Sequence, residues 1–498
     1  MLKKEYMWLA LIFVLVLGTR LYFAFQTPYF SEDAYFNIRQ AEHIRETALP
    51  LFKDDLSYSG RNFLFQPFFQ YILAFFNLFM PLSLVCKLLP NIFASSLIFI
   101  VYFIVKEITK SHGAALFSSF ISGFIPIFFA ETVNSVSVFS LVIPLMFFLI
   151  YSLIKINKDE KYISYFVVSI IIIALMHASA FLLIMAFLLY VLFIKLEHLK
   201  QSRAELELII FSTILVLWLN FIIYKNAFLV HGQFVIWQNI PKELLGRYFS
   251  QLNILNALYY IGIIPLFSGI YIIYKYTFKK KNRNVYILMG FALSTLFLLW
   301  LRLIPLKTGL IFFGIILVLL FSKFYSDSLL FIDKTRFSRY KTLFIILIFL
   351  VFIFNSIIPT ISYTSRIIRE TPSKHEIDAL LWLKNNSDEE DVILASLDEG
   401  YLINAIAKRK NVIDKNFLLI KDAEQRLEDI RKIYTTHYET EAIPLLNKYD
   451  VKYIVLSKRS MEDYNMVDLN YRTDAKCFEL VYDKEVKIYK SLCRMEEK

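Results

Sequence analysis

Long apolar runs dominate the sequence and constrain its fold more than any other feature. A helix that crosses a bilayer needs about 20 mostly apolar residues. Eleven runs meet or approach that requirement: 7–25, 85–105, 114–129, 133–154, 161–176, 178–196, 206–225, 255–275, 285–301, 305–322 and 341–358. A twelfth run, 64–80, is shorter and rich in Phe. The pattern predicts a polytopic α-helical membrane protein with about 11 to 13 transmembrane helices.

The composition supports this class and excludes several others. Hydrophobic residues make up 57 % of the 498 residues and charged residues only 19 %, against about 45–50 % and 25 % in soluble domains. A soluble cytosolic enzyme, a disordered chain and a disulfide scaffold are therefore excluded. The net charge of +11 is explained by Lys and Arg in cytoplasmic loops. No run of basic and aromatic residues indicates a nucleic-acid partner.

The positions of the basic residues predict the orientation in the cell membrane. Six clusters lie between the apolar runs, near residues 3–4, 106–110, 155–161, 195–203, 275–283 and 323–341. All six fall on the cytoplasmic side if the N-terminus is cytoplasmic, the eleven long runs cross, and 64–80 does not. We therefore expect 64–80 to be an interfacial or re-entrant helix. The outer segments are then 26–63, 130–134, 226–254, 302–304 and the tail from about residue 360.

The tail is predicted to be a separate α/β domain outside the cytoplasm. Its composition becomes polar after residue 360, and buried strands are indicated at 392–395 and 451–456. Helical patterns cover 374–386 and 421–448, and Ser373 with Glu376 forms a capping-box signature. Strands that alternate with helices favour an α/β unit. We expect a transmembrane domain over 1–360 and an extracytoplasmic domain over 361–498.

Cysteine usage adds one conditional expectation. The chain has three cysteines, and their spacing suggests neither a disulfide framework nor a metal site. A bridge between Cys477 and Cys493 is compatible with a tail outside the cell.

Acidic residues in the first two outer segments are candidates for chemistry. Glu32 and Asp33 follow the first span closely, and Glu131 is the only acid in the second outer turn. Carboxylates at such places bind divalent cations through hard oxygen ligands or act as bases. If the two segments fold together, Asp33 and Glu131 share one metal. The alternatives are an ordinary polar loop and helix capping by Asn134 or Ser135.

Two further residues stand at the ends of apolar runs. Arg302 ends a long run and is followed by Lys307. A charge so close to hydrocarbon is costly and often functional, and the planar guanidinium suits a phosphate. Snorkelling to the headgroups is the alternative. His177 lies between two spans, where a packing role is favoured over a ligand role. The amphipathic stretch 241–255 lies either on the membrane surface or over a site as a flap.

A family resemblance rests first on the loop after the first span. Asp33, Phe36, Asn37 and Arg39, within EDAYFNIRQAEHI, resemble the first acidic motif of the oligosaccharyltransferase catalytic subunit. That motif reads Asp-x-Trp-Phe-Asn-x-Arg, and Tyr35 replaces the Trp here. The order of parts is similar too: an acidic loop after span one, a second polar motif before a span, a later arginine and a soluble C-terminal domain.

The second resemblance lies in the tail. The stretch 398–414 resembles the part of that family that holds its Trp-Trp-Asp-Tyr-Gly motif. Asp398 and Gly400 match, whereas Ser396 and Leu397 replace the two tryptophans. The resemblance implies acceptor binding by Asp398, Gly400 and Tyr401, without the tryptophans that grip an acceptor Ser or Thr in the family.

The resemblance implies a membrane glycosyltransferase of the GT-C superfamily. Its donor is a sugar on a polyprenyl phosphate or pyrophosphate, and its cofactor is a divalent cation, Mg²⁺ or Mn²⁺. Asp33 is then the catalytic residue and, with Glu131, a metal ligand, while Arg302 binds the donor phosphate. Further candidate site residues are Asn37, Arg39, Asn134 and His177.

The acceptor implied first is a protein, as in N-glycosylation. One alternative is a monosaccharide transferase of the same superfamily that acts on lipid or cell-wall glycan. Another class remains open: a transporter of lipid-linked glycans or an inactive scaffold. Divalent-metal dependence of sugar transfer from a polyprenyl-linked donor discriminates between these.

Overall fold

The computed structural model describes residues 4–251, 253–472 and 476–494. The chain divides into two compact units. The helical unit comprises Met1–Pro28, Gln66–Ile223 and Arg247–Arg369, and the sheet unit comprises Tyr29–Phe65, Tyr224–Gly246 and Glu370–Lys498. Each unit is described by itself below.

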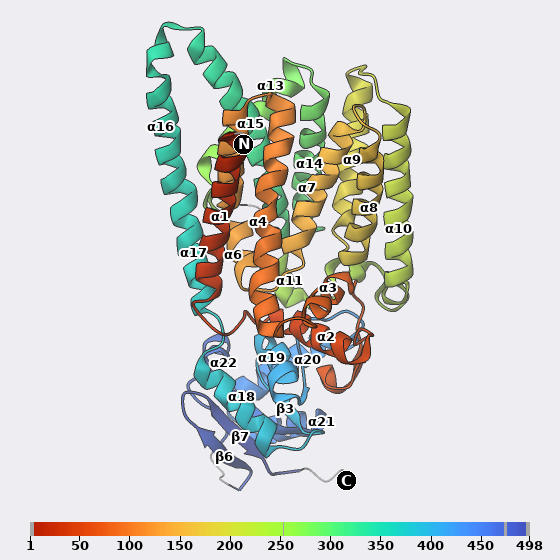
Figure 1. Cartoon of the computed structure of the whole chain (residues 1–498). Helices are drawn as coiled ribbons and strands as arrows, with labels where there is room; N and C mark the ends of the chain where they lie inside the picture. Colours follow the sequence, from red (N-terminus) through yellow and green to blue (C-terminus); the bar gives the residue numbers. More distant parts are fainter. Residues whose placement is uncertain (1–3, 252, 473–475, 495–498) are drawn as a thin grey trace. The chain divides into compact units, whose positions relative to one another are not determined.

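Each of the eleven apolar runs coincides with a helix or with a bent pair of helices (Figure 1). The principal helices are α1 (Lys4–Ala24), α4 (Leu82–Thr109), α5 (His112–Gly123), α6 (Pro126–Val133), α7 (Phe139–Lys155), α8 (Lys161–Met176), α9 (Ala180–Leu196), α10 (Arg203–His231), α12 (Ile254–Ile261), α13 (Ile263–Phe278), α14 (Arg283–Trp300), α15 (Leu306–Asp333), α16 (Lys341–Phe352) and α17 (Ile358–Arg369). Within the described residues, six helical segments are long and apolar enough to cross a membrane, or eight if each bent pair is one span. The shorter apolar helices α7, α8 and α9 account for the other runs. This is the polytopic helical fold class that the sequence predicts.

The twelfth run forms a helix too short to cross. Helix α3 covers only Phe68–Phe76, which is 9 residues. At about 1.5 Å per residue it extends about 14 Å, half of a hydrocarbon core. This length fits the prediction that 64–80 does not span the membrane.

Two of the runs are broken, for identifiable reasons. Helices α5 and α6 meet at 49° because Pro126 begins a new helix at its first position. Helices α12 and α13 meet at 112° around Gly262. Gly262 has φ +97°, and a Cβ there would lie 2.6 Å from Ser356 Oγ, so the position requires glycine. Residues Ile353–Ile357, between α16 and α17, form a π-helical turn.

The basic clusters converge in two groups within the helical unit. Glu107, near the end of α4, pairs with Lys110, Lys155 and Lys158, and the Lys106 ammonium lies 5.7 Å from the Tyr6 ring. These contacts bring the beginning of α1 and two basic clusters together. In the second group Lys281 pairs with Glu197, Arg283 with Glu205, and Lys275 with Asp327. Each group brings together basic clusters that the predicted orientation assigns to the cytoplasmic side of the membrane.

The sheet unit contains a five-stranded mixed sheet in the order β4-β3-β5-β7-β6. The strands are β3 (Val392–Leu394), β4 (Lys410–Asn411), β5 (Val451–Leu456), β6 (Phe478–Asp483) and β7 (Lys487–Ser491). Strand β3 is parallel to β4 and β5, and β7 is antiparallel to β5 and β6. The helices of this unit are α2 (Ala34–Thr47), α18 (Lys374–Asn386), α19 (Gly400–Leu402), α20 (Ala423–Thr435), α21 (Glu439–Lys448) and α22 (Lys458–Asp463), and α11 (Lys242–Tyr248) spans the unit boundary. A second, two-stranded sheet pairs β1 (Lys53–Asp54) with β2 (Arg61–Asn62).

The α/β prediction for the tail is confirmed in its main elements. The predicted strands are β3 and β5, and α18 has the predicted bounds with Ser373 and Glu376 as a capping box. The helical pattern at 421–448 is interrupted after Thr435, so it forms α20 and α21.

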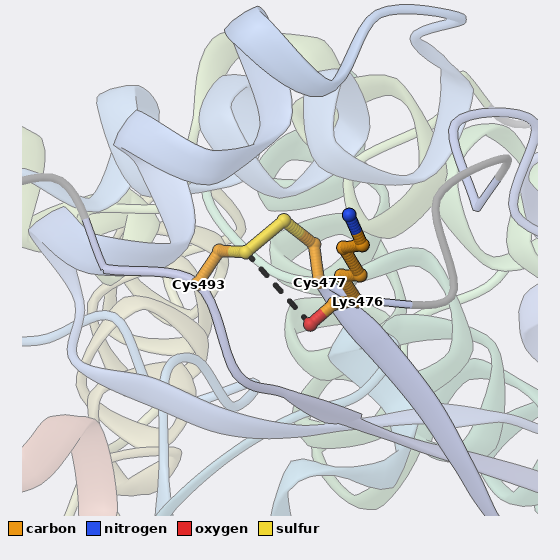
Figure 2. Close-up of a disulfide and its surroundings, with 3 residues drawn as sticks. All are labelled: Lys476, Cys477 and Cys493. Carbon is orange, nitrogen blue, oxygen red and sulfur yellow. Dashed lines mark hydrogen bonds between the residues drawn. A yellow bond between two sulfur atoms is a disulfide. The ribbon is translucent and has the colours of Figure 1, made fainter.

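Cys477 and Cys493 form a disulfide, as the sequence allowed (Figure 2). Cys477 precedes β6 and Cys493 follows β7, so the bond closes the ends of this hairpin. The third cysteine, Cys86, is buried and reduced.

The sheet unit also includes two segments that the sequence assigned to the transmembrane domain. Ser57 Oγ donates to Asp414 Oδ2 at 2.6 Å, and Tyr58 lies in the core of the sheet unit. Asn239 Nδ2 donates to Ile420 O at 2.7 Å, and Leu244 packs on the same core. Segments 29–65 and 224–246 therefore fold with the tail, whereas the predicted division ran at residue 360.

Candidate functional site

Three carboxylates of the sheet unit surround one lysine. Lys415 Nζ lies 3.0 Å from Asp33 Oδ1, 3.2 Å from Glu32 Oε2 and 3.0 Å from Asp398 Oδ1. Glu32 also pairs with Arg459, on α22. The four acidic and basic groups around Lys415 thus join the loop after α1, the 3-10 turn after β3 (Leu397–Glu399) and α22. We call these five residues the acid cluster.

The three carboxylates differ in their access to solvent. The side chains of Glu32 and Asp398 are 11 % and 9 % exposed, whereas that of Asp33 is 67 % exposed. Glu32 and Asp398 are therefore anchors within the fold. Asp33 is the one carboxylate of the acid cluster that a substrate can reach.

Helix α2 begins directly after Asp33 and carries the rest of the first motif. Asn37 lies four residues after Asp33, one helical turn along α2, so the two residues are on the same face of the helix. Arg39 makes two 2.6 Å contacts with the two oxygens of Asp54, which is 1 % exposed. This bidentate pair fixes α2 against β1, so Arg39 positions the motif rather than binding a ligand.

The second motif packs directly on the first. The rings of Phe36 and Tyr401 lie 5.6 Å apart. A Cβ on Gly400 would lie 2.3 Å from Ile413 O, so only glycine lets the segment approach this closely. Burial and the negative charges of Asp414 and Asp33 raise the pKa of Tyr401, which keeps its hydroxyl a hydrogen-bond donor.

Glu399 is a buried acid that the sequence did not single out. Its carboxylate accepts a hydrogen bond from Ser396 N at 3.1 Å. Burial raises the pKa of Glu399 to about 7, against hydrogen bonds from Ser457 and Ser396 that favour the charged form. Its charge therefore changes near neutral pH, next to Asp398.

Glu131 lies in the helical unit, on the last turn of α6. The sequence predicted a turn there, but the apolar residues after Pro126 extend the helix to Val133. Glu131 Oε1 lies 2.7 Å from Lys307 Nζ and accepts from the Tyr363 hydroxyl. Lys307, which the sequence indicated only as a neighbour of Arg302, is thus the cationic partner of Glu131.

Two buried cations near Glu131 were not predicted. Lys87 Nζ donates to Asn134 Oδ1 at 2.5 Å and to Thr27 O at 3.0 Å. Arg20 is 1 % exposed and donates to Asn91 Oδ1 at 3.1 Å. A single charge within an apolar run was the signal available for both residues.

The two remaining sequence candidates are also in the helical unit. Arg302 lies exposed in the turn between α14 and α15, with φ +55°, so its side chain begins at the end of a span. His177 lies between α8 and α9, where its Nδ1 accepts from Ser179 N at 3.0 Å and its ring lies 4.7 Å from that of Phe139. These contacts agree with the packing role for His177.

The predicted metal ligands are divided between the two units. Asp33 belongs to the sheet unit and Glu131 to the helical unit, so their sharing of a metal stays a prediction. Within the described ranges, no group of three or more His, Cys, Asp or Glu side chains is arranged to hold a metal ion. Each predicted ligand faces an ammonium group, Lys415 for Asp33 and Lys307 for Glu131. Carboxylate oxygens are the type of ligand that a hard divalent cation prefers.

Comparison with known proteins finds similarity in structure alone. No protein-family model and no curated protein sequence matches the chain. The oligosaccharyltransferase AglB from Archaeoglobus fulgidus, in complex with an inhibitory peptide and a dolichol-phosphate, aligns with a TM-score of 0.67 and 15 % identity over 91 % of this chain and 70 % of that chain. An Archaeoglobus fulgidus oligosaccharyltransferase in complex with Zn and sulfate aligns with a TM-score of 0.64 and 16 % identity over 94 % of this chain and 71 % of that chain.

A second kind of enzyme is similar over almost its entire length. ArnT from Cupriavidus metallidurans bound to undecaprenyl phosphate aligns with a TM-score of 0.59 and 9 % identity, over 98 % of this chain and 99 % of that chain. The chain therefore shares its fold with these two proteins, a mostly helical fold with several apolar helices and a C-terminal sheet-containing region, and the resemblance of its sequence is confirmed at the level of the fold.

Proposed function

We propose that this protein is an integral-membrane glycosyltransferase that transfers a sugar or oligosaccharide from a polyprenyl-linked donor to an acceptor. The GT-C fold supports this class of reaction. The observation that carries the proposal is the exposure of Asp33 within an otherwise buried acid cluster. A solvated carboxylate on a fixed scaffold fits the residue that meets an acceptor.

Asp33 acts on the acceptor in this proposal. Its carboxylate orients the acceptor nucleophile and takes the proton that the nucleophile loses. The nucleophile bonds to the anomeric carbon of the sugar while the bond from that carbon to the phosphate oxygen breaks. Without a metal, Lys415 holds Asp33 in place through one oxygen. With the proposed cation bound, that oxygen would be a metal ligand, and in both states the other oxygen is left for the acceptor.

Arg302 binds the donor phosphate in this proposal. Its place at the end of a span puts the guanidinium near the depth of a lipid phosphate, where two parallel N–H donors match two phosphate oxygens. The leaving phosphate gains negative charge during transfer, and a fixed cation stabilises that charge. Lys307 and the buried Lys87 add positive charge to the helical unit.

A divalent cation, Mg²⁺ or Mn²⁺, is proposed as the cofactor, held by Asp33 and Glu131. Carboxylate oxygens are the ligands that these hard cations prefer. When bound, the ion neutralises charge on the leaving phosphate. Lys415 and Lys307 are its competitors for the two carboxylates, so metal binding requires these ammonium groups to move aside.

The leading proposal for the acceptor is a protein. AglB is an oligosaccharyltransferase with a bound inhibitory peptide in its structure. Here Asp398 belongs to the acid cluster, and Gly400 and Tyr401 follow it closely along the chain. Against a conventional sequon site, Asp398 is 9 % exposed and pairs with Lys415. The second candidate is therefore a monosaccharide transferase for lipid or cell-wall glycan, favoured by the 99 % coverage of ArnT.

The proposed orientation has the N-terminus in the cytoplasm and the sheet unit outside. The disulfide supports it, because such bonds persist in oxidising compartments. A cysteine introduced at Val467, which is 83 % exposed, tests it in the Cys86→Ser background, where the other two cysteines form the disulfide. Labelling of Val467→Cys in intact cells by a membrane-impermeant reagent is expected, and labelling only after permeabilisation contradicts the orientation.

The function is tested by transfer in proteoliposomes. Purified full-length protein receives a polyprenyl-linked donor and either a peptide with an Asn-x-Ser/Thr sequon or a lipid acceptor. The wild type is expected to transfer the sugar to one of the two acceptors. The control variant Asp55→Ala, which removes another exposed acid of segment 29–65, is expected to do the same, whereas Asp33→Ala is expected to lose transfer. The donors tested are a series that a GT-C enzyme of known activity accepts. If the wild type transfers sugar from none of them to either acceptor, the proposal is contradicted.

A further inference from the structure

A basic cavity of about 300 Å³ lies at one end of the helical unit, where α4 and α7 end. It is lined by Phe103, Lys106, Glu107, Lys110, Tyr151 and Lys155. Within the helical unit, this end is distant from Glu131 on α6. The Lys106 ammonium lies 5.7 Å from the ring of Tyr6, whereas Arg20, which contacts the α6 end, lies 14 positions later on α1, or about 21 Å along a helix.

The cavity carries an excess of positive charge. Glu107 is its only acid, and its carboxylate lies 2.6 Å from Lys110 Nζ and 2.7 Å from Lys155 Nζ, with Lys158 as a third partner. Lys106 pairs with no carboxylate among the residues that the structure describes, and it lies over the rings of Tyr6 and Tyr102. Four lysines thus face one carboxylate.

This convergence exceeds what membrane orientation requires. The positive-inside rule asks only for lysines in cytoplasmic loops. Here lysines of α4, of its C-terminal cap and of α7 line one cavity around an acid that is 9 % exposed. The cavity also has an apolar rim that faces outward, since Phe103 is 37 % exposed. A charged pocket beside an exposed aromatic side chain suits an amphiphile with an anionic head.

We propose that this cavity binds the phosphate of an anionic phospholipid headgroup. Lys106 and Lys110 supply N–H donors to the phosphate oxygens, and basic pockets between transmembrane helices are known to hold such headgroups. Glu107 sets the strength of binding because it neutralises part of the lysine charge. The acyl chains lie along the exposed apolar face of α4. The site is independent of the proposed transferase activity.

The test is native mass spectrometry of the full-length protein in detergent, titrated with phosphatidylglycerol and with phosphatidylcholine of the same acyl chains. Lys106→Gln combined with Lys110→Gln leaves Glu107 with Lys155 and Lys158, so folding is expected to persist. Loss of the two charges is expected to weaken phosphatidylglycerol binding on the order of 30-fold. Glu107→Gln is expected to strengthen it, by about 5-fold.

The matched control removes two exposed lysines from other basic clusters, through Lys200→Gln with Lys280→Gln, and is expected to bind as the wild type does. Equal binding by the cavity variant and this control overturns the proposal. Equal binding of phosphatidylcholine and phosphatidylglycerol by the wild type also overturns it. If excess inorganic phosphate displaces phosphatidylglycerol completely, the cavity is a site for a free anion, and the proposal that it binds a lipid headgroup is overturned.

Discussion

Replacing Lys415 by glutamine tests whether the acid cluster holds the sheet unit together. The substitution removes the ammonium that faces Asp33, Glu32 and Asp398. Glu32 keeps Arg459 as a partner, and Asp33 is solvated, so the main cost falls on Asp398, which is 9 % exposed. Breaking a buried ion pair from one side costs about 3–5 kcal/mol. Because Lys415 itself is 17 % exposed, we expect roughly 3 kcal/mol.

A loss of roughly 3 kcal/mol corresponds to a fall of about 6–12 °C in the Tm of a unit of this size. Thermal unfolding of the purified full-length protein, followed by the fluorescence of a probe attached to the sheet unit, measures this shift. The control is Lys410→Gln, because Lys410 pairs with Glu390, which is 84 % exposed, and such pairs contribute about 0–1 kcal/mol.

The partner of Lys415 is identified by a double-mutant cycle with Asp398→Asn. The variant with both substitutions is expected to recover much of the lost Tm, because the Asp398 carboxylate that Lys415 neutralises is then absent as well. A Lys415→Gln variant as stable as the wild type refutes the reasoning. Equal losses with and without Asp398→Asn refute the assignment of the cost to Asp398.

Three other predictions concern the sheet unit and the donor. Glu399→Gln should flatten the pH dependence of the free energy of unfolding. Because the pKa of Glu399 in the folded state is raised to about 7, its contribution to stability is full below about pH 4.5 and is lost as the pH rises through 7, by up to roughly 3 kcal/mol. An unchanged pH profile contradicts this. Joint replacement of Cys477 and Cys493 by serine should lower the free energy of unfolding by about 3 kcal/mol, for a sequence separation of 16, and reductant should lower it only in the wild type. Arg302→Lys should weaken donor binding by about 1.5–3 kcal/mol, since lysine supplies a point charge, and wild-type donor affinity and turnover would favour snorkelling instead.

The sequence predicted the helices better than their breaks. Apolar runs specify helices because every backbone polar group must be satisfied within lipid. The break at Gly262 depends on its close approach to Ser356, 94 positions later, and a local pattern does not contain that contact. Pro126 was a visible signal for the break between α5 and α6.

The strands of the tail were predicted only where they are buried on both faces. Strand β5 has five buried residues out of six, so its mostly apolar sequence indicated a buried strand. Strand β6 carries an exposed Glu and β7 carries two partly exposed Lys residues, so neither strand forms an apolar run. The hairpin that carries the disulfide was therefore missed, although the pairing of its cysteines was foreseen as an option.

For the candidate site, the motif residues were predictable and their partners were not. Asp33 was found because its neighbours along the chain form a motif. Its partner Lys415 lies 382 positions away, and no spacing rule connects the two. Lys87 and Arg20 could have been found, because an isolated charge in an apolar run already indicates a buried role.

The most direct test of the account is the transfer rate of Asp33→Asn in proteoliposomes with a saturating polyprenyl-linked donor. The amide keeps the size of the side chain and its place beside Lys415 but cannot take a proton. Removing a general base costs about 10²–10⁴-fold in rate, and we expect a loss of that order with unchanged Tm and donor affinity. A transfer rate within threefold of wild type, roughly 0.6 kcal/mol, would contradict the central role of Asp33.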